Sequence, residues 1–302
     1  MTSFPEDYLL PVDKPEGPTS HDVVSRARKA LGVRRIGHTG TLDPFASGLL
    51  LLCVGKATRL AEYFSGLDKT YEAEARLGQR TDTLDRDGEV LGSSEGWKEL
   101  TSAGIEAALA AFRGDIQQVP PQYSAKKVGG ERAYHAAREG RTVELEPVGV
   151  TIRSLELTAV ELPFIRFRVS CSSGTYIRAL ARDIGEVLQV GAHLTTLRRT
   201  AVGAWSVDHA LALEGLSDPA LVSEAAVAPL AALGHLPSVE VDGDVAARLM
   251  LGQAVRLADG ELPGASPEEP EGLTVAVAHA GELLAIGEAD AGVLRPRKVF
   301  AA

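Results

Sequence analysis

Two β-rich segments that follow one another directly constrain the fold more than any other feature of this sequence. Residues 148–162 and 164–172 are rich in Val, Ile, Leu, Phe and Thr, and a predicted helix over 175–188 comes only after the second of them. Strands joined without an intervening helix pair in antiparallel fashion, whereas parallel βαβ repeats need a crossover after each strand. The sequence therefore predicts an α+β fold with a mixed, largely antiparallel sheet and flanking helices.

The remaining segments extend this pattern. Apolar periodicity predicts further strands over 8–12, 49–54, 70–77 and 194–202. It predicts helices between Thr19 and Gly32 and over 57–64, 101–113 and 132–138. We expect a main domain over residues 1–235 and a small β-rich domain over 236–302. Within the small domain, residues 259–272 are rich in Pro, Gly and Glu and predict a surface loop.

The charge distribution bears on the class of partner. The chain has 31 basic and 41 acidic side chains, and a net charge of -10 argues at first against nucleic acid. However, residues 201–302 contain 5 basic and 15 acidic side chains, whereas residues 121–200 contain 12 and 8. A polyanion could therefore be bound by the first 60 residues and by 121–200, provided that their bases share a face.

Cysteine content and apolar runs indicate the compartment. Cys53 and Cys171 are the two cysteines, so the sequence has neither a disulfide framework nor the spacing of a zinc knuckle. The first ten residues do not resemble a signal peptide, and the apolar run over 49–54 is far too short to cross a bilayer. We expect a soluble, cytoplasmic protein without a bound metal.

The densest chemical signal is the segment GHTGTLDPFASG over residues 37–48. Its glycines and Pro44 favour an irregular backbone that holds the Asp43 carboxylate in one direction, with His38 five residues earlier. Taken alone, the pattern also fits an aspartate that caps a turn beside an ordinary loop histidine. The segment lacks the Walker, dinucleotide-binding and zinc-protease motifs.

With its flanking motifs, this segment resembles the TruB family of tRNA pseudouridine-55 synthases. The matching motifs are LPVDKP at 10–15, the segment 37–48, GKATR at 55–59, KTY at 69–71, LGQRTDT at 77–83, PPQYSA at 120–125, RAY at 132–134 and SGTYIR at 173–178. The resemblance implies the pseudouridine synthase fold and a PUA-like RNA-binding domain at the C-terminus. It also implies a cofactor-free isomerase that acts on the T stem-loop of tRNA, as a monomer without an obligatory protein partner.

By this resemblance, the catalytic residues are Asp43, Arg178 and Tyr71. Arg178 pairs with the Asp43 carboxylate, and Tyr71 stacks on the extruded uracil; whether its hydroxyl also acts as a base stays open. Isomerisation breaks the N1–C1′ bond and rejoins the base through C5, and an anion can attack or stabilise the electron-poor centre. Attack at the sugar, attack at C6 and removal of a ribose proton all remain open. A cation in the first turn of a helix is locally unfavourable, so we expect tertiary contacts to hold Arg178.

The resemblance also implies a set of RNA contacts. His38 wedges into the loop when the target uridine is flipped out. Tyr176 and Leu197 line the pocket, and Lys14 and Pro15 contact the RNA. A thumb-like insertion over about 124–147 supplies further basic side chains, namely Lys126, Lys127, Arg132, Arg138 and Arg141.

Two other classes of function stay open. The first is a tRNA-folding chaperone or RNA-binding protein with a secondary catalytic pocket. The second is an unrelated hydrolase that uses Asp43 and His38 as a metal-binding or acid/base pair. The full set of Asp43, Tyr71 and Arg178 argues against a role in binding alone, and the hydrolase lacks further clustered ligands.

Overall fold

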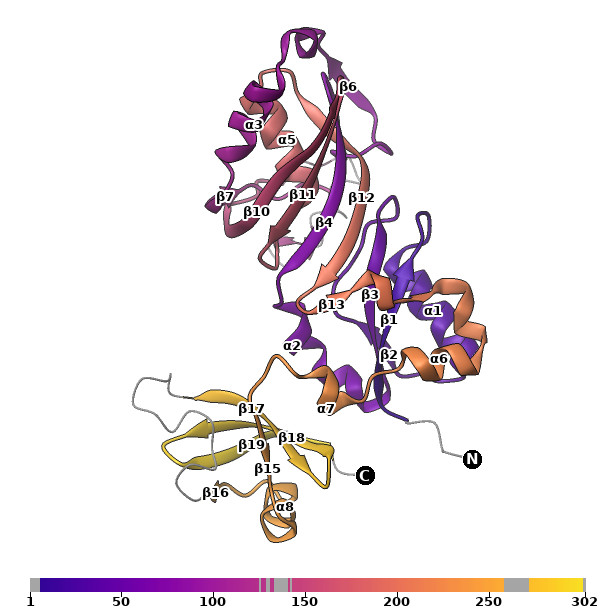
Figure 1. Ribbon diagram of the computed structural model, residues 1–302, viewed down its shortest axis with the longest axis vertical. Helices are drawn as coiled ribbons and strands as arrows, with labels where there is room; N and C mark the ends of the chain where they lie inside the picture. The colour runs from indigo at the N-terminus through magenta and orange to yellow at the C-terminus, as the bar shows by residue number, and fades with distance from the viewer. Residues whose placement is uncertain are drawn as a thin grey trace.

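A ten-stranded mixed sheet forms the body of the protein, and a separate five-stranded sheet lies at one end of the elongated molecule (Figure 1). The computed structural model describes residues 6–124, 126–128, 131–132, 141, 143–257 and 272–300. In the main sheet, two strand pairs are parallel, β1 (Tyr8–Lys14) with β14 (Leu211–Ala212) and β3 (Ser47–Val54) with β12 (Ala192–Val202), and the other pairs are antiparallel. The predicted α+β class with a largely antiparallel sheet is confirmed.

Six of the ten strands of the main sheet match predicted ones, and the other four, over 36–38, 114–118, 205–206 and 211–212, were not predicted. In spatial order they are β14 (Leu211–Ala212), β1 (Tyr8–Lys14), β3 (Ser47–Val54), β12 (Ala192–Val202), β4 (Lys69–Leu77), β11 (Phe164–Cys171), β10 (Val148–Glu161) and β7 (Gly114–Gln118). At its margins, β13 (Trp205–Ser206) pairs with β12, and β2 (Ile36–His38) pairs with β3. A short hairpin of β5 (Gln79–Thr81) and β6 (Val90–Ser93) lies outside this sheet.

Capping groups set the ends of the helices. The helices are α1 (Ser20–Leu31), α2 (Ala61–Ser65), α3 (Ser102–Ala110), α5 (Ile177–Val187), α6 (Pro219–Ala225), α7 (Pro229–Ala232) and α8 (Gly243–Met250). Helix α1 begins with a capping box between Thr19 and Asp22 and ends at Gly32, which adopts a φ of 68°. The helix expected over 57–64 is instead a 3₁₀ segment, Gly55–Leu60, followed by α2.

Three hydrophobic cores involve the main sheet, and one of them, with Leu51 and Phe64, lies on the face of β1 and β3 opposite to α1. Helices α3 and α5 pack on one face of β4, β10, β11 and β12 through a core that includes Leu109, Leu180 and Ile184 (Figure 1). Helix α1 covers the other half of the sheet through Val23, Val24 and Ala27, which pack on β1 and β3. The candidate site lies where these two halves meet, because the link between β2 and β3 inserts Leu42, Phe45 and Ala46 into the first core.

The C-terminal sheet docks on the 3₁₀ segment and α2. Its strands are β15 (Ser238–Glu240), β17 (Leu273–His279), β18 (Glu282–Asp290), β19 (Val293–Val299) and β16 (Val255–Arg256). The Arg59 guanidinium donates to the carbonyl of Val299 at 2.5 Å and lies 4.8 Å from the centre of the Phe300 ring. The Lys298 ammonium contacts Glu62 and donates to the carbonyl of Arg59. The domain boundary at residue 236 stays a prediction.

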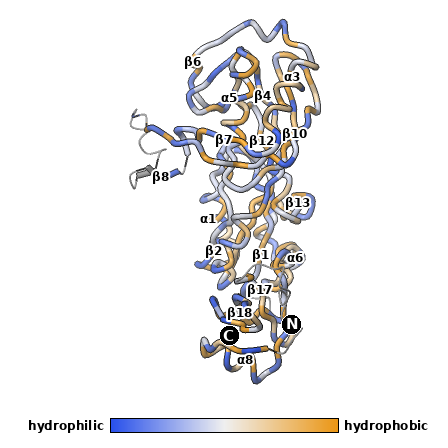
Figure 2. The backbone as a smooth tube through the Cα atoms, turned by 90° about the vertical axis from the view of Figure 1, so that its left-hand side faces the viewer, coloured by the Kyte–Doolittle hydropathy of each residue, from blue (hydrophilic) through white to orange (hydrophobic). Residues whose placement is uncertain are grey.

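The basic insertion is described only in part. A two-residue hairpin pairs β8 (Lys127–Val128) with β9 (Glu131–Arg132), and β8 lies to one side of the main body (Figure 2). The helix predicted over 132–138 falls almost entirely outside the described residues, as do Arg138 and most of the predicted loop over 259–272. In the described ranges, none of the helices is long and apolar enough to cross a membrane.

Candidate active site

Groups from other segments fix the backbone around Asp43. The Ser20 hydroxyl donates to the carbonyl of Leu42 and accepts from its N–H, at 3.1 and 2.8 Å. The N–H of Gly17 donates to the carbonyl of Pro44 at 2.8 Å. Because hydrogen bonds join this backbone to α1 and to the segment before α1, the loop holds Asp43 in a fixed position.

The Asp43 side chain is the solvent-exposed part of this loop. Its neighbours Leu42, Phe45 and Ala46 are each less than 5 % exposed, whereas the Asp43 side chain is 35 % exposed. Buried apolar residues on both sides of Asp43 anchor the loop, so the carboxylate can point only outward. Asp43 is therefore both accessible to a ligand and held in place.

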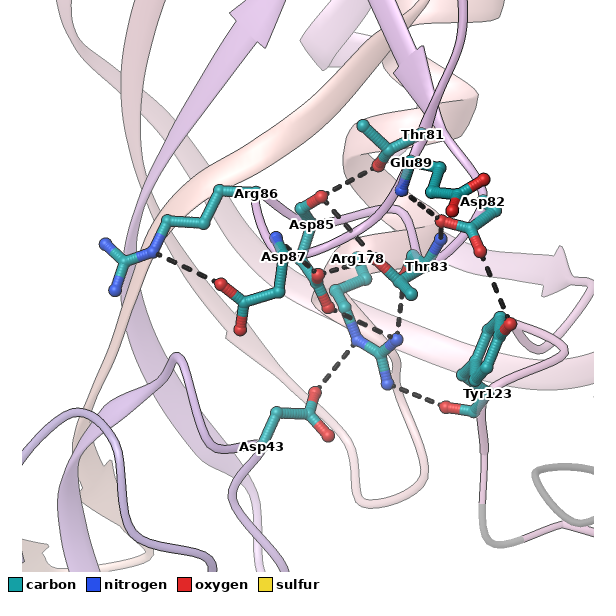
Figure 3. A network of polar contacts seen from close by, with 10 residues as sticks. All are labelled: Asp43, Thr81, Asp82, Thr83, Asp85, Arg86, Asp87, Glu89, Tyr123 and Arg178. Carbon is teal, nitrogen blue, oxygen red and sulfur yellow. Dashed lines mark hydrogen bonds and ion pairs between the residues drawn. The ribbon is translucent and has the colours of Figure 1, made fainter. Parts of the chain in front are cut away.

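Arg178 meets Asp43 from the other half of the sheet (Figure 3). It is the second residue of α5, and its Nε lies 2.9 Å from Oδ2 of Asp43. Its Nη1 donates to the carbonyl of Thr83 at 2.8 Å, and its Nη2 donates to the carbonyl of Tyr123 at 2.9 Å. The guanidinium is only 6 % exposed, so the tertiary contacts expected for this arginine are present.

A second carboxylate, Asp85, completes this network and was not predicted. Its Oδ2 lies 3.6 Å from Nη1 of Arg178, and its Oδ1 accepts from the Thr83 hydroxyl at 2.6 Å and from the N–H of Asp87 at 3.1 Å. Burial raises the pKa of Asp85, and its hydrogen bond with Thr83 and the charge of Arg178 oppose that rise. Asp85 comes shortly after the motif LGQRTDT, which was the one sequence feature that could have identified it as a site residue. Nothing in the sequence distinguished it from Asp82 or Asp87.

Tyr71, Tyr176 and Leu197 all lie close to Asp43. Tyr71 and Leu197 are 8 % and 6 % exposed and share a core with Leu42 and Phe45. Burial raises the pKa of the Tyr71 phenol, and the guanidinium of Arg199 opposes that rise. Burial also raises the pKa of Tyr176, whose backbone N–H and carbonyl pair with the buried Gln118 side chain. Both phenols are therefore neutral at physiological pH.

His38 ends β2, just before the loop that carries Asp43. Its ring packs edge to face on His21 with a centroid distance of 5.6 Å, and its Nδ1 is buried without a hydrogen-bond partner in the described part of the chain. Burial lowers the pKa of His38 to about 4, and the charges of His21 and Arg199 add to this effect. The imidazole is therefore neutral at physiological pH.

Lys14 requires a correction, because the structure contradicts its predicted role as a phosphate contact. Its side chain is fully buried, and the ammonium donates to the carbonyls of Pro15, Pro18 and Pro44 at 2.9, 2.9 and 3.4 Å. Burial lowers its pKa to about 8. All three hydrogen bonds go to carbonyls, so Lys14 stabilises the backbone around the loop, and Pro15 is half-buried.

The other predicted basic contacts are only partly described. Lys126 and Arg141 are exposed, as an RNA-facing side chain must be. The side chains of Lys127 and Arg132 are not described, and Arg138 lies outside the described residues. At the C-terminus, Arg295 and Arg297 pair with Asp290 and Glu288.

Clustered metal ligands do not occur in the described residues, where no group of three His, Cys, Asp or Glu side chains could hold an ion. The partners of Asp43 and His38 also differ. Asp43 pairs with Arg178, and His38 packs on His21. This geometry does not favour the hydrolase interpretation, which required Asp43 and His38 to act as a pair.

Comparisons with known proteins agree with this geometry. Residues 28–177 match the model of the TruB family pseudouridylate synthase N-terminal domain, and residues 178–233 and 237–300 match models of TruB C-terminal domains. The chain is 47% identical over 297 residues to tRNA pseudouridine synthase B of Burkholderia pseudomallei (strain 668), with 97% of this chain and 96% of that protein covered. It is 46% identical over 301 residues to the protein of the same name from Arthrobacter sp. (strain FB24), with 97% and 96% covered.

Among solved structures, a chain of a Cbf5-Nop10-Gar1 complex superposes with a TM-score of 0.75 and 27% identity, over 98% of this chain and 85% of that one. A chain of an H/ACA RNP bound to a substrate RNA containing 2'-deoxyuridine gives a TM-score of 0.73 and 26% identity, with the same shares covered. The full-length identity and the three matching domain models together show that this chain belongs to the TruB family of pseudouridine synthases.

Proposed function

We propose that this protein isomerises uridine 55 in the T loop of tRNA to pseudouridine. The ion pair between Asp43 and the buried Arg178 carries this proposal, because it presents one fixed carboxylate at the edge of the core that contains Tyr71. The relatives named tRNA pseudouridine synthase B support tRNA as the substrate. The reaction needs no cofactor or protein partner, and the cytoplasm is where unmodified tRNA is available.

In this proposal Asp43 acts directly on the target uridine. A carboxylate can capture the sugar, add to C6 of the ring or remove a ribose proton, and in each case it must be ionised and aimed. Arg178 orients the Asp43 carboxylate. Its own guanidinium is fixed, because its other donors bind the carbonyls of Thr83 and Tyr123. Asp85 pairs with the same guanidinium, so Arg178 and Asp85 are residues that position Asp43.

Base flipping explains the aromatic and imidazole side chains around Asp43. A uridine in a folded loop is stacked, so the enzyme must extrude it before Asp43 can reach it. Tyr71 stacks on the extruded uracil, and Tyr176 and Leu197 form the wall of the pocket. His38 fills the place that the uridine leaves, since a neutral ring stacks on bases without a fixed charge.

The basic side chains of Lys126, Lys127, Arg132, Arg138 and Arg141 bind the phosphates of the T arm in this proposal. The PUA-like domain over 236–302 has a smaller role, because Arg297 pairs with Glu288, and Lys298 with Glu62 across the interface with the main domain. RNA binding is therefore centred on residues 1–200, where the basic side chains are concentrated.

Replacement of His38 tests the wedge. We expect His38→Ala to weaken tRNA binding by about 1–3 kcal/mol, the value of one lost stacking contact. We expect His38→Phe, which keeps a flat ring, to bind nearly as well as the wild type. Because the pKa of His38 is about 4, the penalty should be equal at pH values on either side of an ordinary histidine pKa. A penalty that appears only in acid, measured by filter binding, would contradict a neutral wedge.

Tritium release tests the proposed function. Unmodified tRNA that carries tritium at C5 of its uridines should lose one equivalent per molecule on incubation with the protein, without added metal or nucleotide. The same tRNA with cytidine at position 55 is the matched control and should lose none. Release from the control tRNA would place the reaction at another uridine, and no release from either would contradict the function.

A further inference from the structure

Arg199 is a buried arginine at the candidate site that no prediction covered. It lies on β12, two residues after Leu197, and is 2 % exposed. Its side chain makes no ion pair with a carboxylate in the parts of the chain that the structure describes. Its donors point instead at backbone carbonyls: Nε at Leu49 (2.7 Å), Nη2 at Gly40 (3.1 Å) and Nη1 at Thr41 (3.4 Å).

These contacts close the loop that carries Asp43. Gly40 and Thr41 precede Asp43, and Leu49 follows it on β3, so one guanidinium spans both ends of the loop. The backbone of Arg199 closes the same loop a second time. Gly48 pairs with Arg199 across the parallel β3–β12 contact, and a Cβ on Gly48 would lie 2.2 Å from the Arg199 carbonyl oxygen. Gly48 has a φ of +106°, so this close approach requires glycine.

Arg199 also lies against Tyr71. The two residues are cross-strand partners in the β12–β4 register, on the face of the sheet that holds the site. The charge of Arg199 reaches Lys14 and His38 as well, where it contributes to the lowered pKa of each. Arg199 is therefore the side chain that joins the Asp43 loop to the tyrosine that the proposed function places on the uracil.

Burial of a guanidinium without a counter-ion is costly, and satisfied carbonyls offset only part of that cost. The neighbour Arg198 shows the ordinary alternative: it faces the other side of the sheet, is partly exposed and pairs with Asp13 at 2.8 Å. A packed apolar side chain at position 199 would avoid the cost but leave the Gly40 and Leu49 carbonyls unsatisfied. A lysine would present all its donors from a single atom, whereas the guanidinium presents Nε and Nη2 from separate atoms of one rigid plane.

We propose that Arg199 is a positioning residue for isomerisation, which fixes the Asp43 loop and Tyr71 relative to one another through its planar guanidinium. This inference rests on the proposed function. It predicts that replacement of Arg199 slows the chemical step and leaves tRNA affinity almost unchanged, because Arg199 is buried and its donors are taken up by backbone carbonyls. A displacement of about 1 Å in a reacting group costs on the order of 100-fold in rate.

The test compares Arg199→Lys with the matched control Arg198→Lys on the same strand. Single-turnover tritium release, with enzyme in excess over tRNA, measures the chemical step, and filter binding measures affinity. We expect Arg199→Lys to lose about 100-fold in rate with less than about threefold change in Kd. We expect Arg198→Lys to stay within about threefold in both. A wild-type rate in Arg199→Lys, or an equal loss of rate and affinity, would overturn the proposal.

Two further measurements keep the proposal testable. Arg199→Gln keeps two N–H donors for the loop carbonyls, and the same criteria apply to it if the lysine variant does not fold by circular dichroism. Arg199→Lys is also combined with Tyr71→Phe, and we expect the combined loss to be smaller than the product of the single losses. Strict additivity would overturn the link to Tyr71. Absence of release from the wild type would instead show failure of the proposed function itself.

Discussion

Asp43→Asn should reduce the single-turnover rate of pseudouridine formation by at least about 10⁴-fold, as expected for loss of a group that takes part directly in the reaction. The amide has nearly the same shape as the carboxylate but carries no charge and is a far poorer nucleophile and base. The loop should remain in place, because Ser20, Lys14 and Arg199 hold its backbone and not its side chain.

The tRNA affinity of Asp43→Asn is the control for this prediction. Asp43 contributes a negative charge next to a polyanion, so its removal should leave binding unchanged or slightly tighter. Tritium release and filter binding on one preparation measure both quantities. Release within about tenfold of the wild-type rate would remove Asp43 from its assigned role.

Arg178→Met should affect stability as well as activity. The substitution removes the counter-ion of Asp85, a buried carboxylate, and we expect the free energy of unfolding to fall by about 3–5 kcal/mol. We expect the rate to fall by about 10²–10³-fold, because Asp43 keeps its charge but loses the group that orients it. Urea denaturation and single-turnover tritium release measure the two effects.

The double variant Asp85→Asn/Arg178→Met separates these effects. It no longer buries an unpaired charge, so it should recover most of the lost stability while the rate stays low. The pH dependence has a definite sign. Burial already raises the pKa of Asp85, so protonation of Asp85 in the folded single variant should restore stability as the pH falls. Equal stability of the single and double variants at neutral pH would contradict this account of Asp85.

The sequence predicted the elements that local chemistry determines. The hairpin of β10 and β11 followed from two adjacent β-rich runs, and the ends of α1 followed from Thr19 and Gly32. The pairing of Asp43 with Arg178 was an expectation from family resemblance, and the unfavourable place of Arg178 at a helix N-terminus supported it. The structure brings the two side chains together.

The predictions that were wrong or missing concern the burial of charged residues. Lys14 was assigned to phosphate because it is cationic, yet it follows Val12 by two residues on β1 and so shares its buried face. The same strand parity relates Arg199 to Leu197 and could have identified it. Asp85 had no such signal, because it lies in an irregular segment whose burial depends on contacts with Arg178 of α5 and Leu194 of β12.

The structure of the Asp43→Asn variant bound to tRNA is the most direct test of the central claim, that a fixed carboxylate acts on a uridine removed from its stack. The account predicts uridine 55 outside the loop, with its uracil on Tyr71, its ribose or ring within about 4 Å of residue 43 and His38 in the vacated place. A uridine 55 that remains stacked in the T loop, with residue 43 still bound to Arg178 and far from any nucleotide, would contradict it.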